Sequence, residues 1–220
     1  KKDLGSGFSE LTISNGIIYT MTSEIVDSIR GFEFVAAYDE NTGNELWRSQ
    51  VDSIYFDADG WGNGSRSTTI IDENQIYSFS GHGKLSANSL KNGTLNWQLD
   101  FVKEFGTTTP RWGFASSPSI VDDVLIMEVG GTDSRAFMGF NKKDGSINWS
   151  NENGNASHDS PLVTSIDGQE QIIFANGRKL YSFNSTGDTL WTFNMPFGGL
   201  TAIPILIDEN KIFLSGVRTP

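Results

Sequence analysis

The chain has 220 residues, enough for one all-β domain, and its lack of cysteine excludes disulfides, thiolate nucleophiles and cysteine metal sites. A hydrophobic content of 37%, with 15 Phe and 6 Trp, predicts a substantial core, and 24 Gly predict many turns. The net charge of −11 makes nucleic acid a poor partner, and no apolar run is long enough for a transmembrane segment.

Hairpin signals recur along the chain, each made of two short apolar runs around a turn. The first is 11–21, where Asn15 and Gly16 form the dipeptide most typical of a two-residue hairpin turn. The later ones follow in chain order at 67–80, 117–129, 161–175 and 203–215. Evenly repeated short strands of this kind predict an all-β fold.

Four of these hairpins are followed by a glycine turn and, four residues after the glycine, by a tryptophan. The pairs are Gly43 and Trp47, Gly93 and Trp97, Gly145 and Trp149, and Gly187 and Trp191. The steps between the tryptophans are 50, 52 and 42 residues, a period typical of β-propeller blades. Each unit is therefore predicted to be a four-stranded antiparallel blade.

The predicted organisation is a single propeller domain, or a fragment of one, over residues 1–220. Its blades are expected at 9–51, 67–100, 117–150 and 160–194, with a half blade at 201–215. Each repeat tryptophan is expected to lie flat against the neighbouring blade, where burial of its ring contributes about 4–6 kcal/mol gross. Each repeat glycine is expected to supply a positive φ.

The string 37–47 reads AYDENTGNELW and holds a complete A-x-D-x-x-T-G-x-x-x-W pattern, with degenerate copies at 87–97, 139–149 and 181–191. This pattern resembles the pyrroloquinoline-quinone-type (PQQ) repeat of quinoprotein dehydrogenases and of the outer-membrane-assembly lipoprotein B. The resemblance covers essentially the whole chain and implies an exported, periplasmic bacterial protein. Family members usually close seven or eight blades, so about four and a half blades predict a fragment or an end-to-end dimer.

Long loops enter the innermost strands, and in a propeller such loops cluster at one mouth of the channel. Arg66 and Arg111 are candidate forks for a carboxylate, and Trp61 and Trp112 are candidate platforms for a planar or sugar ligand. In the competing interpretation, Arg66 pairs with an acidic loop residue and both tryptophans pack beneath the loops. The sequence leaves both interpretations open.

Catalytic and metal candidates are few. His158 beside Asp159 is a candidate acid or base, although such a pair also stabilises loops. Asp57 and Asp59 resemble part of a calcium loop but lack its third Asp or Asn and its distant Glu. No nucleophile elbow, P-loop or paired-histidine zinc motif is present.

Three function classes follow from these observations. We expect a noncatalytic envelope scaffold that binds a protein or peptide, because no complete catalytic constellation is present. A PQQ- and calcium-dependent alcohol or sugar dehydrogenase is the first alternative, although the family's cysteine pair is absent and its metal ligands cannot be mapped onto this sequence. A carbohydrate-binding propeller is the second alternative, with the mouth aromatic residues stacking on sugar rings.

Overall fold

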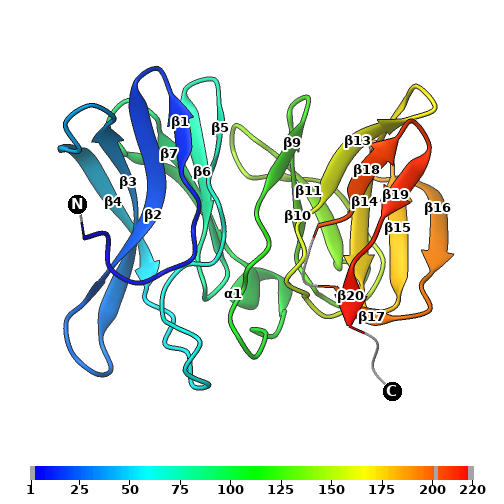
Figure 1. Ribbon diagram of the computed structural model, residues 1–220, viewed down its shortest axis with the longest axis horizontal. Helices are drawn as coiled ribbons and strands as arrows, with labels where there is room; N and C mark the ends of the chain where they lie inside the picture. Colours follow the sequence, from blue (N-terminus) through cyan, green and yellow to red (C-terminus); the bar gives the residue numbers. More distant parts are fainter. Residues whose placement is uncertain (1–2, 201–202, 218–220) are drawn as a thin grey trace. The chain divides into compact units, whose positions relative to one another are not determined.

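A computed structural model describes residues 3–200 and 203–217, and every strand pair in those residues is antiparallel. Sixteen of the strands form four four-stranded sheets in which neighbours in sequence are neighbours in the sheet (Figure 1). The predicted all-β fold of four-stranded antiparallel blades is confirmed. The chain divides into two compact units, residues 1–104 with 109–118, and residues 105–108 with 119–220.

Unit 1 holds the first two sheets. Its first sheet is β1 (Thr12–Ser14), β2 (Ile17–Ile25), β3 (Gly31–Asp39) and β4 (Glu45–Ser53), and its second is β5 (Ile70–Asp72), β6 (Gln75–Phe79), β7 (Lys84–Ser89) and β8 (Leu95–Asp100). The first turn has a positive φ at both Asn15 and Gly16, as the dipeptide predicted. A short helix, α1 (Phe101–Phe105), follows β8 and has no counterpart in the sequence prediction.

The core of unit 1 lies between its two sheets. It contains Tyr19, Met21, Val35, Ala37 and Val51 from the first sheet and Ile76 from the second. Alternation of side chains along β2 and β3 places this apolar set on one face. The ring of Phe79 lies 4.9 Å from that of Phe101 and 5.3 Å from that of Phe114, so the core continues under the segment 109–118.

Unit 2 holds two further four-stranded sheets and two short strand pairs. The four-stranded sheets are β9 (Ser119–Val121), β10 (Val124–Glu128), β11 (Phe137–Asn141) and β12 (Ile147–Asn151), then β13 (Leu162–Ile166), β14 (Gln169–Asn176), β15 (Lys179–Phe183) and β16 (Thr189–Asn194). The pairs are β17 (Gly198–Leu200) with β20 (Gly216–Val217) and β18 (Ile205–Asp208) with β19 (Lys211–Phe213). Residues 201–202, the start of the predicted half blade, lie outside the described residues.

The core of unit 2 is rich in phenylalanine. The rings of Phe137 and Phe174 stack with centroids 4.3 Å apart, and Phe183 lies 5.6 Å from Phe137. Trp149 and Ile172 belong to the same buried cluster. Because these residues come from β11, β12, β14 and β15, burial of their rings joins the two four-stranded sheets of this unit.

Two repeat tryptophans each lie on the glycine turn of the next sheet. The indole Nε1–H of Trp47 donates to the Leu90 carbonyl at 3.2 Å, and that of Trp149 donates to the Ser185 carbonyl at 3.1 Å. A Cβ added to Gly93 would lie 2.5 Å from the ring of Trp47, and Gly187 stands in the same relation to Trp149. Both glycines also have a positive φ, so both backbone conformation and ring contact require glycine there.

The remaining repeat positions differ in their surroundings. Gly43 and Gly145 share the positive φ, but nothing lies within 4 Å of a Cβ added to Gly43. Trp191 donates its Nε1–H to the Gln171 side chain of its own sheet at 2.7 Å, and the ring of Trp97 lies 6.0 Å from Tyr77.

Candidate functional site

Two loop segments of unit 1 meet at a carboxylate. Arg111 binds Asp59 through two hydrogen bonds, Nε to Oδ2 at 2.8 Å and one terminal nitrogen to Oδ1 at 3.0 Å, and Trp112 Nε1 donates to the same Oδ2 at 2.8 Å. The Tyr55 hydroxyl donates to the Arg111 carbonyl at 2.7 Å. The Arg111 guanidinium, and then the Trp112 indole, hold the pKa of Asp59 below its usual value. Asp59 is thus ionised, and its hydrogen bonds join the loop 57–66 to the segment 109–116.

Arg66 does not reach the surface beside Arg111. Its side chain is only 10% exposed, and its two terminal nitrogens donate to the carbonyls of Gly62 and Gly64, each at 2.7 Å. The guanidinium also lies 3.8 Å from the buried Asp57 carboxylate and 5.0 Å from the centre of the Tyr55 ring. Its donors therefore hold the loop in which it sits, next to an acidic loop residue.

The two candidate tryptophans are exposed. Trp61 has 71% and Trp112 has 40% of its surface in solvent, and the Arg111 guanidinium lies 6.0 Å from the Trp112 ring. The backbone of Trp61 is fixed because its N–H donates to Asp57 Oδ2. We call Trp61, Arg111 and Trp112 the loop face. These residues belong to the two loop segments joined at Asp59 and supply two exposed aromatic rings and an exposed guanidinium.

A residue that sequence reasoning missed supports this loop. Glu33 on β3 is fully buried, and its carboxylate accepts hydrogen bonds from the Ser65 hydroxyl at 2.7 Å, the Tyr55 N–H at 3.1 Å and the Gly81 N–H at 3.2 Å. Burial raises the pKa of Glu33, and the three donors oppose that rise. The sequence did offer a signal for Glu33, because it stands two positions before Val35 and so shares the core face of the strand. A buried carboxylate in that place needs hydrogen-bond partners.

Unit 2 contains a pair of buried carboxylates, Glu128 and the catalytic candidate Asp159. Asp159 is 5% exposed, burial raises its pKa to about 7, and its N–H donates to the Ser157 hydroxyl at 3.2 Å. Glu128, at the end of β10, accepts from the Ser157 N–H and hydroxyl at 3.0 and 2.7 Å and from the Asn176 amide at 2.6 Å. Burial, with the Asp159 charge, raises the pKa of Glu128 to about 7.

Both raised pKa values lie near neutral pH, the range in which a general acid or base works. The half-buried His158 lies in the same loop as Asp159. The sequence identified His158 and Asp159 but missed Glu128, whose place at the end of an apolar strand gave no motif.

The candidate calcium ligands Asp57 and Asp59 take part in hydrogen bonds with residues of the two loop segments. Within residues 3–200 and 203–217, no group of three or more His, Asp or Glu side chains is placed to hold a metal ion. The Asp59 oxygens are occupied by Arg111 and Trp112, and one Asp57 oxygen accepts the Trp61 N–H at 2.6 Å. The same described part of the chain contains no helix that is long and apolar enough to cross a membrane.

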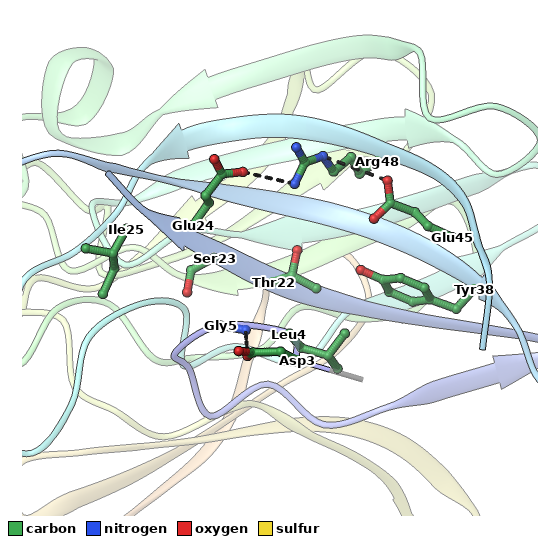
Figure 2. Close-up of a pocket in the computed structure, with 10 residues that line it drawn as sticks. All are labelled: Asp3, Leu4, Gly5, Thr22, Ser23, Glu24, Ile25, Tyr38, Glu45 and Arg48. Atoms are coloured by element: carbon green, nitrogen blue, oxygen red, sulfur yellow. Dashed lines mark hydrogen bonds and ion pairs between the residues drawn. The ribbon is translucent and has the colours of Figure 1, made fainter. Parts of the chain in front are cut away.

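The first sheet carries a pocket on the face turned away from Trp47. Figure 2 shows this pocket, of about 380 Å³, with Arg48 between Glu24 and Glu45. Arg48 lies 3.1 Å from Glu24 and 3.8 Å from Glu45, and its guanidinium lies 4.6 Å from the centre of the Phe34 ring. The charged groups that line the pocket thus partly neutralise one another.

Comparison with known proteins identifies the family. A family model described as outer membrane protein assembly factor BamB matches residues 31–216. The chain belongs to this BamB family of PQQ-like repeat proteins. The family is associated with the bacterial envelope. No curated protein sequence matches the chain.

Several solved structures, one of them a BamB, share the fold of this chain. BamB from Moraxella catarrhalis is 18% identical with a TM-score of 0.58, and the match covers 91% of this chain and 54% of that one. A europium-containing methanol dehydrogenase is 10% identical with a TM-score of 0.60, covering 86% and 42%. A quinohemoprotein alcohol dehydrogenase from Pseudomonas putida is 12% identical with a TM-score of 0.55, covering 88% and 34%. The chain thus spans about half the length of the BamB structure.

The likeness to quinoproteins raises the question of whether this BamB-family chain fits PQQ. A quinone that carries carboxylates needs cationic donors that are not already engaged. On the loop face, Arg111 donates to Asp59, while the donors of Arg66 bind loop carbonyls. Two of the five Arg111 N–H donors are thus taken by Asp59, and a carboxylate of the cofactor would have to share this exposed guanidinium with that residue.

Proposed function

We propose that the chain is part of a noncatalytic binding scaffold of the bacterial envelope, working in the periplasm on a protein or peptide partner. One observation carries the proposal. On the loop face the polar side chains satisfy one another through Asp59, while the Trp61 and Trp112 rings remain exposed on a fixed backbone. Exposed aromatic residues and arginine on a rigid support are characteristic of protein-binding surfaces.

Membership of the BamB family supports this proposal, because the family is named for assembly of outer-membrane proteins. The net charge of −11 would repel an anionic partner, and this also favours a polypeptide that is not strongly acidic. The hydrogen bonds beneath the loop face reduce the conformational entropy that binding would otherwise cost.

The proposal is tested by capture from bacterial envelope extract. The biotinylated chain and a Trp61→Ala, Trp112→Ala variant are compared, with Ile147→Ser, an exposed apolar residue of unit 2, as the matched control. We expect a defined envelope protein to be recovered with the chain and the control, and reduced at least about tenfold with the tryptophan variant. Equal recovery with all three proteins would refute a binding role for the loop face.

The alternative proposal is a PQQ- and calcium-dependent alcohol or sugar dehydrogenase. The observation that favours it is the Glu128 and Asp159 pair, because alcohol oxidation needs a group that accepts a proton near neutral pH. Titration with PQQ in the presence of calcium, followed by tryptophan fluorescence and cofactor absorbance, tests it. Saturable, stoichiometric binding would favour the dehydrogenase over the scaffold.

A carbohydrate-binding function is the remaining proposal, and the exposed rings of Trp61 and Trp112 favour it. Its test is a glycan array probed with the chain and with the Trp61→Ala, Trp112→Ala variant. A glycan that binds the chain but not the variant would identify a sugar, rather than a protein, as the ligand.

A further inference from the structure

A buried carboxylate in the loop 153–160 of unit 2 has no hydrogen-bond donor for one of its oxygens. Asp159 is only 5% exposed, and its Oδ1 atom is buried and accepts no hydrogen bond from the described residues. The carboxylate of Glu128, which is 1% exposed, lies close enough for the Asp159 charge to oppose its ionisation. A buried charge without donors is costly, and a like charge beside it adds to the cost. Asp159 therefore gains by reaching solvent when it ionises.

The two carboxylates differ in how firmly they are held. Glu128 ends β10, which lies between β9 and β11 in its sheet, and its oxygens accept hydrogen bonds from Ser157 and from the Asn176 amide. Asp159 lies outside the strands, and its N–H donates to the Ser157 hydroxyl at 3.2 Å. A charge on Asp159 can therefore be relieved by movement of the loop, whereas Glu128 is fixed by the sheet.

The loop 153–160 is held on the sheet by hydrogen bonds rather than by apolar side chains. Its sequence, NGNASHDS, contains one alanine as its only apolar side chain. Ser157 donates to Glu128 at 3.0 and 2.7 Å, and the Asn176 amide donates to the Asn155 carbonyl at 2.7 Å. Segments that bury few apolar groups open locally at a lower free energy than the core does. Breaking these hydrogen bonds would therefore free the loop without unfolding the sheet.

Other charged or titratable groups lie in the segments around the loop. They are the half-buried His158 in the loop itself, Glu152 just before it, Asp133 and Arg135 between β10 and β11, and Arg178 after β14. In the described part of the chain, none of these alters the pKa of Asp159 or of Glu128. Burial acts on Asp159, and on Glu128 burial acts together with its hydrogen bonds and the Asp159 charge. Because an unperturbed histidine titrates in the same range, His158 still needs a control variant.

We propose that the loop 153–160 is a pH-controlled flap, which stays on the sheet while Asp159 carries its proton and lifts into solvent once that proton has passed to water. Lifting places the Asp159 carboxylate in solvent and uncovers Glu128 and the end of β10. The closed form is therefore favoured at low pH, and the open form gains population as pH rises through the range in which Asp159 ionises. This inference does not depend on the scaffold function, and it adds a regulatory device to unit 2.

Hydrogen exchange followed by mass spectrometry tests the flap, in the original chain and in Asp159→Asn at about pH 6 and about pH 8. Because burial raises the pKa of Asp159 to about 7, the opening equilibrium of the original chain should rise about tenfold between those pH values. The exchange rate of residues 153–160, divided by that of an unstructured peptide at the same pH, should rise by this factor. In Asp159→Asn, whose side chain cannot ionise, the corrected rate should not change.

Matched measurements separate the flap from other causes. The amides of β11 report unfolding of the sheet and should show no such rise, and His158→Gln should keep the tenfold rise of the original chain. Equal corrected rates in the loop 153–160 at both pH values would refute the flap, as would a rise that persists in Asp159→Asn. A rise that is lost in His158→Gln would make the histidine the trigger, and an equal rise in β11 would show unfolding of the whole sheet. Either of these results would also overturn the inference.

Discussion

Replacing Gly93 by alanine should cost more than the same change at Gly43, although both glycines occupy the same turn of the repeat. Both have a positive φ, of 73° and 68°, so each alanine carries about 1–2 kcal/mol of backbone strain. Only Gly93 faces a ring, because its added Cβ would lie 2.5 Å from Trp47 Cε3 and 3.0 Å from two further ring carbons. Carbon atoms in contact are normally about 3.5–4.0 Å apart, so the indole must retreat by about 1 Å.

Overpacking of this kind costs about 1–3 kcal/mol, and the displaced indole also loses its 3.2 Å hydrogen bond to the Leu90 carbonyl, worth about 1 kcal/mol. We therefore expect Gly93→Ala to destabilise unit 1 by about 3–6 kcal/mol and Gly43→Ala by about 1–2 kcal/mol. The free energy of unfolding in urea, followed by tryptophan fluorescence, measures both.

A double-mutant cycle isolates the ring contact. In a Trp47→Leu background, Gly93→Ala should cost no more than Gly43→Ala does in the original chain, because the colliding ring is gone. Equal destabilisation by the two alanine variants in the original chain would refute the argument. It would show that backbone strain alone fixes the repeat glycine.

The remaining predictions concern charge. Because burial raises the pKa of Glu128 to about 7, the stability that its protonated form contributes is complete below the unfolded pKa and is lost as pH rises through 7. The free energy of unfolding of Glu128→Gln, measured in urea, should therefore gain about 2–3 kcal/mol relative to the original chain between pH 5 and pH 8. A difference that does not depend on pH would contradict this. Arg66→Gln should cost about 3–5 kcal/mol by leaving Asp57 buried and uncompensated, and adding Asp57→Asn should recover part of that loss in the same assay. Asp59→Asn should leave the urea midpoint nearly unchanged but speed proteolysis within residues 109–116, whereas an unchanged cleavage rate would show that Asp59 does not hold the two loop segments together.

The parts of the fold that follow local chemistry were predictable from the sequence. The positive φ at Asn15 and Gly16 follows from the hairpin dipeptide, and alternation along the strands placed Val35 and Ala37 in the core. The helix α1 was not predictable, because five residues are too few to establish a helical period, even though Phe101 and Phe105 stand four positions apart. The nine-residue length of β2 also exceeded the prediction, because the residues after Met21 mix polar and apolar types.

The candidate site was predictable only in outline. Residue types pointed to Arg66 and Arg111, but the acceptors of Arg66 are backbone carbonyls, which no sequence pattern specifies. The partner of Arg111, Asp59, lies 52 positions away, and that pairing depends on how the chain folds. The buried partners of Glu128 are equally scattered along the chain, so its raised pKa could be recognised only from the structure.

The tryptophan-on-glycine contact has a consequence for how such chains change length during evolution. In each contact that the structure shows, one blade supplies the indole and the next blade supplies a glycine turn without a side chain. Trp47 with Gly93 and Trp149 with Gly187 are two instances of this one junction. Duplicating a blade that carries the tryptophan and the glycine would repeat this junction with its neighbour, and removing that blade would leave a junction of the same kind. A gene segment that encodes one such blade can therefore be gained or lost without requiring a new type of contact between blades.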